Sequence, residues 1–199
     1  MPERPYFETV RSFAKVPITE HGVDTASFLE ASDGLVKLFD LLGSGVFGFV
    51  QGDIKGNIEG VRSRYRDASQ LSTTLEDLVR SETSEGLRNG TACLIRLTRG
   101  LMFLCKALQH MQNDLSVELH VCFKRSYDEV LRCHHSFIVR SLAGVAVRAV
   151  PYRRDFIARI SQGGDKEKFG TELANWLGGL DIIVDRLRAF LEEGGYGKV

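Results

Sequence analysis

A carboxylate and an amide lie one helical turn apart in the segment from Phe47 to Arg66. Asp53 and Asn57 are separated by four residues, which puts both side chains on one face of a helix, about 40° apart. Glycine recurs every fourth residue beside them, at Gly48, Gly52, Gly56 and Gly60. Because each glycine in a helix costs about 0.5–1 kcal/mol relative to alanine, this row indicates that something approaches the backbone closely. A site for a ligand with a polar end is one interpretation; two solvated side chains is the other, and is more common.

Two arginines form a second candidate site, in the helical segment GTACLIRLTRGLMFLCKALQH. Arg96 and Arg99 lie about 60° apart, on the face opposite a leucine seam that predicts core packing. Phe103 shares their face and makes it partly apolar. An arginine among small and aromatic residues suits an anionic or planar polar group, while two solvated arginines fit the pattern equally well.

Histidine supplies the third candidate, in the segment Cys133-His134-His135-Ser136-Phe137. Adjacent residues on a helix point to different sides, so the two histidines do not share one site. A histidine here can donate to, or accept from, an amide of a ligand, although a structural hydrogen bond is the commoner role. No second pair of histidines or cysteines has metal-ligand spacing, so the sequence predicts no metal site.

Catalytic motifs and strong charge are both missing from the sequence. There is no G-x-S-x-G elbow, P-loop, H-E-x-x-H or dinucleotide fingerprint, so we predict neither an enzyme nor a cofactor. A formal net charge of zero argues against non-specific nucleic-acid binding. The first residues are charged and lack an apolar signal region, and no run of about 18 apolar residues occurs. The four cysteines form no C-x-x-C pair, so we expect buried thiols in a cytoplasmic protein.

Helices must position all of these groups, because helical periodicity is frequent and no strand-like alternation is convincing. We predict an all-α fold, two packed layers of about eight helices in a single domain over residues 1–199. The predicted helices cover residues 25–42, 47–66, 73–85, 87–112, 116–133, 134–150, 154–160 and 165–192. The stretch 134–150 is apolar on most sides and ends at Pro151, so we expect it to be buried.

Three segments occur together in an order typical of one known family: FDLLGSGVFGFVQGDIKGNI, then CLIRLTRGLMFL, then CHHSFIVRSLAGVAVRAVP. The chain resembles the glycolipid transfer protein family, and the resemblance extends over residues 28–151. It implies a two-layer all-α fold that moves single sphingolipids between membranes without covalent chemistry. It also implies an apolar cavity for the lipid chains and a surface site for the headgroup.

The resemblance assigns roles to individual residues. Asp53 matches the acid that binds the ceramide amide N–H, and His135 matches the histidine that binds the amide carbonyl. Asn57 matches the amide that glycolipid-binding members use on the sugar, but Gly60 stands where they have a lysine. Arg96 stands where they have a tryptophan that stacks on the sugar.

Members that bind ceramide-1-phosphate resemble this chain at Arg96, since they use an arginine there for the phosphate. They also carry a second arginine where this chain has Ala92 and a lysine where it has Asn57. The chain is thus a hybrid of the two patterns, with Arg99 as a candidate for an additional headgroup contact. The residue types favour an anionic headgroup slightly over a sugar, and both stay open.

The candidates for the apolar cavity wall are Phe47, Val50, Phe103 and Phe137, and for each of them plain core packing is the alternative. The implied partners are a sphingolipid and, transiently, a membrane surface, and we expect the protein to act as a monomer. The alternative function is a lipid sensor or scaffold of the same fold that transfers little lipid.

Overall fold

Nine α-helices account for most of residues 4–43, 45 and 47–199, the part of the chain that the computed structural model describes, and this part contains no β-strand. The helices are α1 (Tyr6–Thr9), α2 (Thr25–Leu42), α3 (Gly48–Asp67), α4 (Leu75–Ser84), α5 (Asn89–Asn113), α6 (Leu119–Ser126), α7 (Phe137–Arg148), α8 (Arg153–Ser161) and α9 (Lys166–Glu193). The predicted all-α fold is confirmed, with one more helix than the sequence indicates. The additional α1 has only four residues, which is too short to show a helical period.

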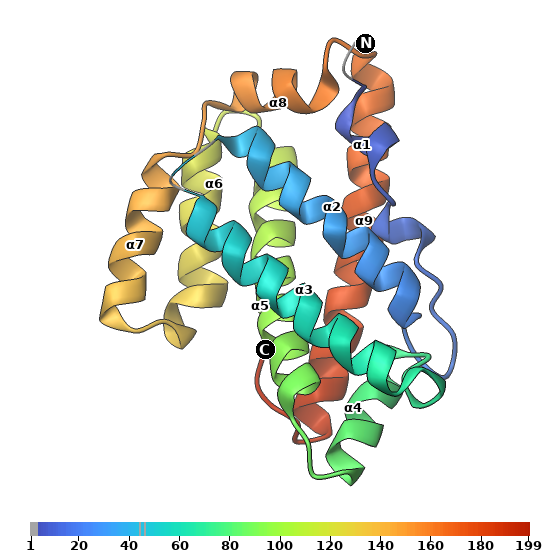
Figure 1. Ribbon diagram of the computed structural model, residues 1–199. Helices are drawn as coiled ribbons and strands as arrows, with labels where there is room; N and C mark the ends of the chain where they lie inside the picture. The colour runs from blue at the N-terminus through green and yellow to red at the C-terminus, as the bar shows by residue number, and fades with distance from the viewer. Residues whose placement is uncertain (1–3, 44, 46) are drawn as a thin grey trace.

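The helices form layers around α5, which packs against α3, α4, α6 and α9. Figure 1 shows α2 and α3 running obliquely across α5 and α9, with α7 at one edge beside α6. The leucine seam of α5 faces into this packing and is buried, as predicted; it comprises Leu94, Leu97, Leu101, Leu104 and Leu108. The opposite face of α5 is therefore the one left for Arg96 and Arg99.

A buried carboxylate fixes the start of α5. Glu82 on α4 accepts hydrogen bonds from the backbone N–H groups of Gly90 (2.8 Å) and Thr91 (2.6 Å) and from the Thr91 hydroxyl. The first N–H groups of a helix have no partner within the helix, and the helix dipole favours a negative charge there. Glu82 thus stabilises the N-terminal end of α5 and ties it to α4.

Helix α6 changes its winding before it ends. It continues into a π-helical turn, η3 (Tyr127–Leu131), and a 3-10 turn, η4 (Arg132–His134). His135 then adopts an extended conformation, and the Ser136 hydroxyl caps α7 by accepting a hydrogen bond from the N–H of Val139. The predicted helices 116–133 and 134–150 are therefore shorter than expected, and His135 lies in the junction between them.

The prediction that residues 134–150 are buried is wrong. Helix α7 has four exposed apolar side chains, and they are Phe137, Ile138, Leu142 and Val145. Only Ala146 and Val147 of α7 are buried. The reason is the position of the helix at the edge of the fold, where it packs chiefly against α6 and leaves one apolar face uncovered (Figure 1). None of the helices in the described ranges is both long enough and apolar enough to span a bilayer.

The segment η1 (Phe13–Lys15) crosses α9 at a glycine. A Cβ at Gly179 would overlap the backbone of Ala14 and lie 2.6 Å from the carbonyl carbon of Phe13. The neighbouring Gly178 is different, since a Cβ there would meet nothing within 4 Å. Gly179 therefore allows the N-terminal segment to lie directly on α9.

We expect Gly179→Ala to lower the free energy of unfolding by about 1–3 kcal/mol, because the methyl group forces η1 away from α9. The matched control is Gly178→Ala, one residue away in the same helix, which we expect to raise stability by about 0.5–1 kcal/mol through helix propensity. Urea unfolding of both variants checks this. Equal effects of the two substitutions would contradict the close contact at Gly179.

Candidate functional site

A cavity of about 540 Å³ opens between α3, α5, α6 and α7, within the usual range of about 300–1,000 Å³ for small-molecule sites. Its polar side chains include Asp53, Arg96, Arg99 and His135, so residues from distant parts of the chain meet at one cavity. Most of the remaining wall is apolar and comes from Phe39, Phe47, Phe49, Val50, Ile54, Phe103, Phe123, Leu131, Val139, Ala143, Ala146, Val147 and Val150. Phe47, Val50 and Phe103 thus lie in the cavity wall.

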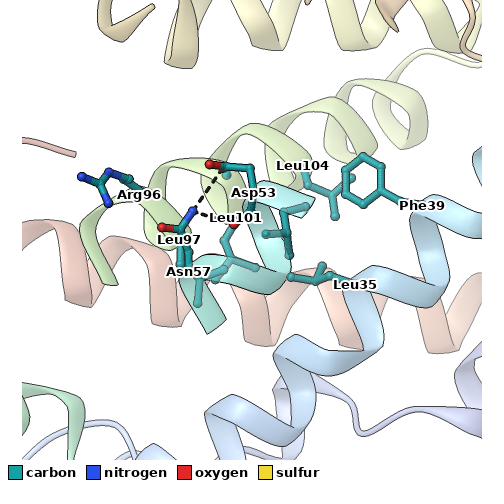
Figure 2. A pocket seen from close by; sticks show the side chains of 10 residues that line it. Leu35, Phe39, Asp53, Asn57, Arg96, Leu97, Leu101 and Leu104 are labelled. Carbon is teal, nitrogen blue, oxygen red and sulfur yellow. Dashed lines mark hydrogen bonds between the residues drawn. The ribbon is translucent and has the colours of Figure 1, made fainter. Parts of the chain in front are cut away.

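Asp53 and Asn57 form a hydrogen-bonded pair on α3. The Asn57 side-chain amide donates to the Asp53 backbone carbonyl (2.9 Å) and to the Asp53 carboxylate oxygen Oδ2 (3.1 Å). Figure 2 shows this pair beside Arg96, which comes from the neighbouring α5. Asn57 is buried, while Asp53 is exposed and lines the cavity. The amide therefore holds one carboxylate oxygen and leaves Oδ1 without a partner among the described hydrogen bonds.

Asn57 does not line the large cavity. It lies at a second, much smaller cavity of about 20 Å³, which shares Asp53 and Arg96 with the large one and is otherwise lined mainly by side chains from α2, α3 and α5. Of the five polar candidates from the sequence, four therefore line the large cavity, and Asn57 lies at the smaller one.

His135 is oriented by a tyrosine that the sequence analysis missed. The Tyr127 hydroxyl lies 3.2 Å from the Nδ1 atom of His135, and both residues line the cavity. Burial raises the pKa of the Tyr127 hydroxyl, so the group stays protonated and can donate to Nδ1. Burial also lowers the pKa of His135, against the opposing effect of the Asp53 carboxylate, which favours a neutral ring. A neutral ring that accepts at Nδ1 carries its proton on Nε2 and donates from there.

The two arginines differ in their surroundings. Arg96 is exposed at the cavity and forms no ion pair with a carboxylate in the described part of the chain. Arg99 is half-buried, and its Nε and Nη2 atoms donate to one oxygen, the backbone carbonyl of Lys198, at 3.1 and 2.5 Å. Burial lowers the pKa of the Arg99 guanidinium, and nearby Arg96 acts in the same direction. The contact with the C-terminal segment could not be read from local spacing.

The four glycines of α3 do not share one environment. A Cβ at Gly48, Gly52 or Gly56 would meet nothing within 4 Å, so at these three positions no other part of the chain approaches the backbone closely. Gly60 differs, because a Cβ there would overlap Cys93 Sγ and lie 2.9 Å from Cys93 Cβ. Cys93 on α5 therefore occupies the space beside the position where a lysine was expected from the resemblance.

The assignment of Phe137 to the cavity wall is wrong. Its side chain is 82% exposed and does not line the cavity. Val139, two residues later, points to nearly the opposite side of α7, about 200° round the helix, and faces the cavity instead. Ala143 and Ala146 continue this inner face. In the described ranges no group of three or more His, Cys, Asp or Glu side chains could hold a metal ion.

The sequence model of the family described as Glycolipid transfer protein (GLTP) matches residues 23–162, which include every polar residue of the site except the C-terminal Lys198. The chain belongs to the glycolipid transfer protein family. Members of this family transfer lipids and are not enzymes.

Two relatives of the glycolipid transfer protein type are closely similar. A glycolipid transfer protein from Aureobasidium melanogenum is 39% identical over 187 residues, which cover 94% of this chain and 92% of the relative. The crystal structure of HET-C2, a fungal glycolipid transfer protein, superimposes with a TM-score of 0.89 at 40% identity and covers 94% of this chain and 96% of that one.

The same fold occurs in a more distant protein that binds another headgroup. The structure of human ceramide-1-phosphate transfer protein in complex with 12:0 ceramide-1-phosphate has a TM-score of 0.84 at 20% identity, covering 97% of this chain and 98% of that one. At this identity the likeness concerns the fold alone. Relatives with this architecture thus bind either glycolipids or ceramide-1-phosphate.

We expect Tyr127→Phe to reduce the preference of His135 for the Nε2–H tautomer about 2- to 10-fold, the effect of losing one neutral hydrogen bond of about 0.5–1.5 kcal/mol. The measurement is ¹⁵N NMR of the imidazole ring at neutral pH, with Tyr65→Phe, which alters a tyrosine that does not line the cavity, as the control. A ring that carries its proton on Nδ1 in the unaltered protein would contradict the assigned direction of this hydrogen bond.

Proposed function

We propose that the chain transfers sphingolipids with a sugar headgroup between membranes, one lipid at a time, with residues 1–199 acting as one domain and as a monomer. The observation that carries the proposal is the pairing of an acceptor and a donor at one cavity, the Asp53 carboxylate and the His135 ring. The similarity to glycolipid transfer proteins over nearly the whole chain supports it.

A secondary amide is the group that this pair fits. Its N–H donates to the Asp53 carboxylate, and its carbonyl accepts from Nε2–H of His135. Asn57 and Tyr127 hold the two side chains in position from behind. A glycerolipid ester has no N–H, so it leaves the carboxylate without a donor. An unpaired polar group costs about 1–3 kcal/mol, which gives a preference for ceramide-based lipids of roughly 5- to 150-fold.

The charges at the cavity favour a sugar over a phosphate. Arg99 donates two N–H groups to the Lys198 carbonyl, and Gly60 leaves no room for a lysine beside Cys93. Burial and nearby Arg99 lower the pKa of His134, so this ring adds no charge at neutral pH. At the cavity, Arg96 attracts a phosphate, whereas the Asp53 carboxylate repels it, so the two effects partly cancel. Sugar hydroxyls both donate and accept, and can bond to either group.

The apolar wall of the cavity offers a surface on which the lipid chains can be buried. Each CH₂ group that leaves water for an apolar surface contributes about 0.8 kcal/mol. Phe47, Val50 and Phe103 lie on the α3 and α5 sides of the cavity, and Val147 lies on the α7 side. This burial offsets what the chains lose when the lipid leaves a bilayer, so lipid exchange needs no chemical energy.

The exposed face of α7 is suited to membrane contact. Phe137 and Ile138 are 82% and 72% exposed, and they are joined by Leu142 and Val145 on the same helix. Exposed apolar patches of this kind mark interaction surfaces. The inner face of α7 lines the cavity, so a bilayer that receives the outer face lies next to the lipid site. We propose transient contact with the cytoplasmic surface of membranes.

We expect the protein to move glucosylceramide between vesicles faster than ceramide-1-phosphate, and at least about 5-fold faster than phosphatidylcholine. Asp53→Ala should slow glucosylceramide transfer by about 10- to 100-fold, because it removes a charged acceptor worth about 1.5–3 kcal/mol. Asp67→Ala, which removes an exposed acid from the same helix, is the matched control. Binding of the lipid without transfer would instead indicate a lipid sensor or scaffold.

We expect Ile138→Glu to lower the fraction of protein bound to vesicles at least 5-fold, because a carboxylate does not enter the apolar part of a bilayer. Ile182→Glu changes an isoleucine on α9 that is 61% exposed, compared with 72% for Ile138, and should have little effect. Vesicle flotation measures the bound fraction. Equal losses in both variants would show that α7 is not the contact surface.

A further inference from the structure

Arg99 is a half-buried cation that lines the cavity. Its guanidinium donates hydrogen bonds to a backbone carbonyl and not, among the described residues, to a carboxylate. Both of its hydrogen bonds go to the Lys198 oxygen, and no carboxylate forms an ion pair with it in the described part of the chain. The titratable groups that act on it are Cys133 and Arg96, and Arg99 in turn acts on His134. A carbonyl dipole offsets only part of a full charge, so moving this carbonyl away would leave a guanidinium able to bind an anion with the same two N–H groups.

The C-terminal segment that provides this carbonyl is held against both α5 and α9. Arg88 at the start of α5 donates to the Tyr196 carbonyl at 2.9 Å, and the Tyr196 ring lies 5.1 Å from the Phe190 ring on α9. The Val199 N–H donates to Glu192 at 3.1 Å. Figure 1 shows the C-terminal segment running beside the lower part of α5 and ending there.

Gly197 permits the close approach of this segment to α5. A Cβ at Gly197 would lie 2.6 Å from the Cδ1 atom of Ile95, a buried residue of α5 one turn before Arg99. Either Ile95 Cδ1 or the segment must shift to make room for a side chain here. Because Ile95 packs in the buried core and has little room to move, we expect the C-terminal segment to be displaced. The glycine provides a way to move the Lys198 carbonyl without changing any residue of the cavity.

We propose that the segment Tyr196–Val199 determines headgroup charge selectivity, by occupying Arg99 with the Lys198 carbonyl and so excluding sphingolipids with a sulfate or phosphate headgroup. This inference rests on the proposed function and extends it. When the segment is displaced, Arg96 and Arg99 lie three residues apart on one face of α5, close enough for both to bind one oxyanion. With the segment in place the cavity accepts neutral sugar headgroups and excludes anionic ones, and without it the cavity accepts both.

Two lipids that differ by one sulfate group provide the test, galactosylceramide and its 3-sulfate. For each protein variant, vesicle transfer and binding of short-chain forms of both lipids in solution are measured, and the ratio of sulfated to neutral lipid is compared. Gly197→Ala should raise this ratio at least 5-fold and leave galactosylceramide transfer within about 2-fold of the unaltered chain, since it displaces the segment only. A chain shortened after Gly195 should give the same result by another route.

Two double variants identify the cause of the change. Ile95→Ala combined with Gly197→Ala restores space for the segment and should return the ratio to its original value. Arg99→Gln combined with Gly197→Ala should also remove the gain, because the released cation is missing. Thermal unfolding of each variant shows whether it is folded at the assay temperature.

An unchanged ratio in both Gly197→Ala and the shortened chain would overturn the inference and leave the proposed function intact. A gain that persists without Arg99 would overturn it as well. Failure of the unaltered chain to bind or transfer galactosylceramide would instead contradict the proposed function, and the inference with it.

Discussion

The contact between α3 and α5 sets the geometry of the binding site. Asp53 and Asn57 belong to α3 and Arg96 belongs to α5, so no single helix carries the whole polar set. At Gly60 the two helices are close enough that Cys93 fills the space of a side chain. Within the described residues no ion pair joins Asp53 to Arg96, although both line the same cavity. Backbone packing, rather than attraction between these charges, therefore sets their separation.

Each of the two proposed amide-binding groups is supported by a neighbour that does not itself need to touch the lipid. Asn57 fixes one oxygen of Asp53, and Tyr127 fixes one nitrogen of His135. A free carboxylate or imidazole can rotate and must lose that freedom when a ligand binds, at a cost in affinity. Because Asn57 and Tyr127 restrict these side chains already in the folded protein, that freedom is lost during folding and no longer reduces the affinity for the ligand. These supporting contacts also explain why buried polar groups beside an apolar cavity do not weaken the fold, since they are satisfied by each other.

Much of the fold and part of the site could be predicted from the sequence. The leucine seam of α5 has a clear helical period, and its burial follows from that period alone. The grouping of Asp53, Arg96 and His135 required the family resemblance, because these residues are far apart in the chain. The exposure of Phe137 was not predictable from hydropathy, since an apolar helix at the edge of a fold has the same composition as a buried one. The contact of Lys198 with Arg99 spans 99 residues and involves a backbone atom, which leaves no trace in side-chain patterns.

Helix α7 is apolar on both its inner and its outer face, and only one of them is covered by protein. In water, moving this helix outward would wet the inner face while the outer face stays wet, so the cavity tends to remain closed around its contents. If α7 meets a bilayer as proposed, its outer face is already out of water there, and an outward movement lets hydrocarbon replace protein on the inner face. The rate of lipid release is then a property of the membrane encountered, and a loaded molecule can cross the aqueous phase without losing its lipid.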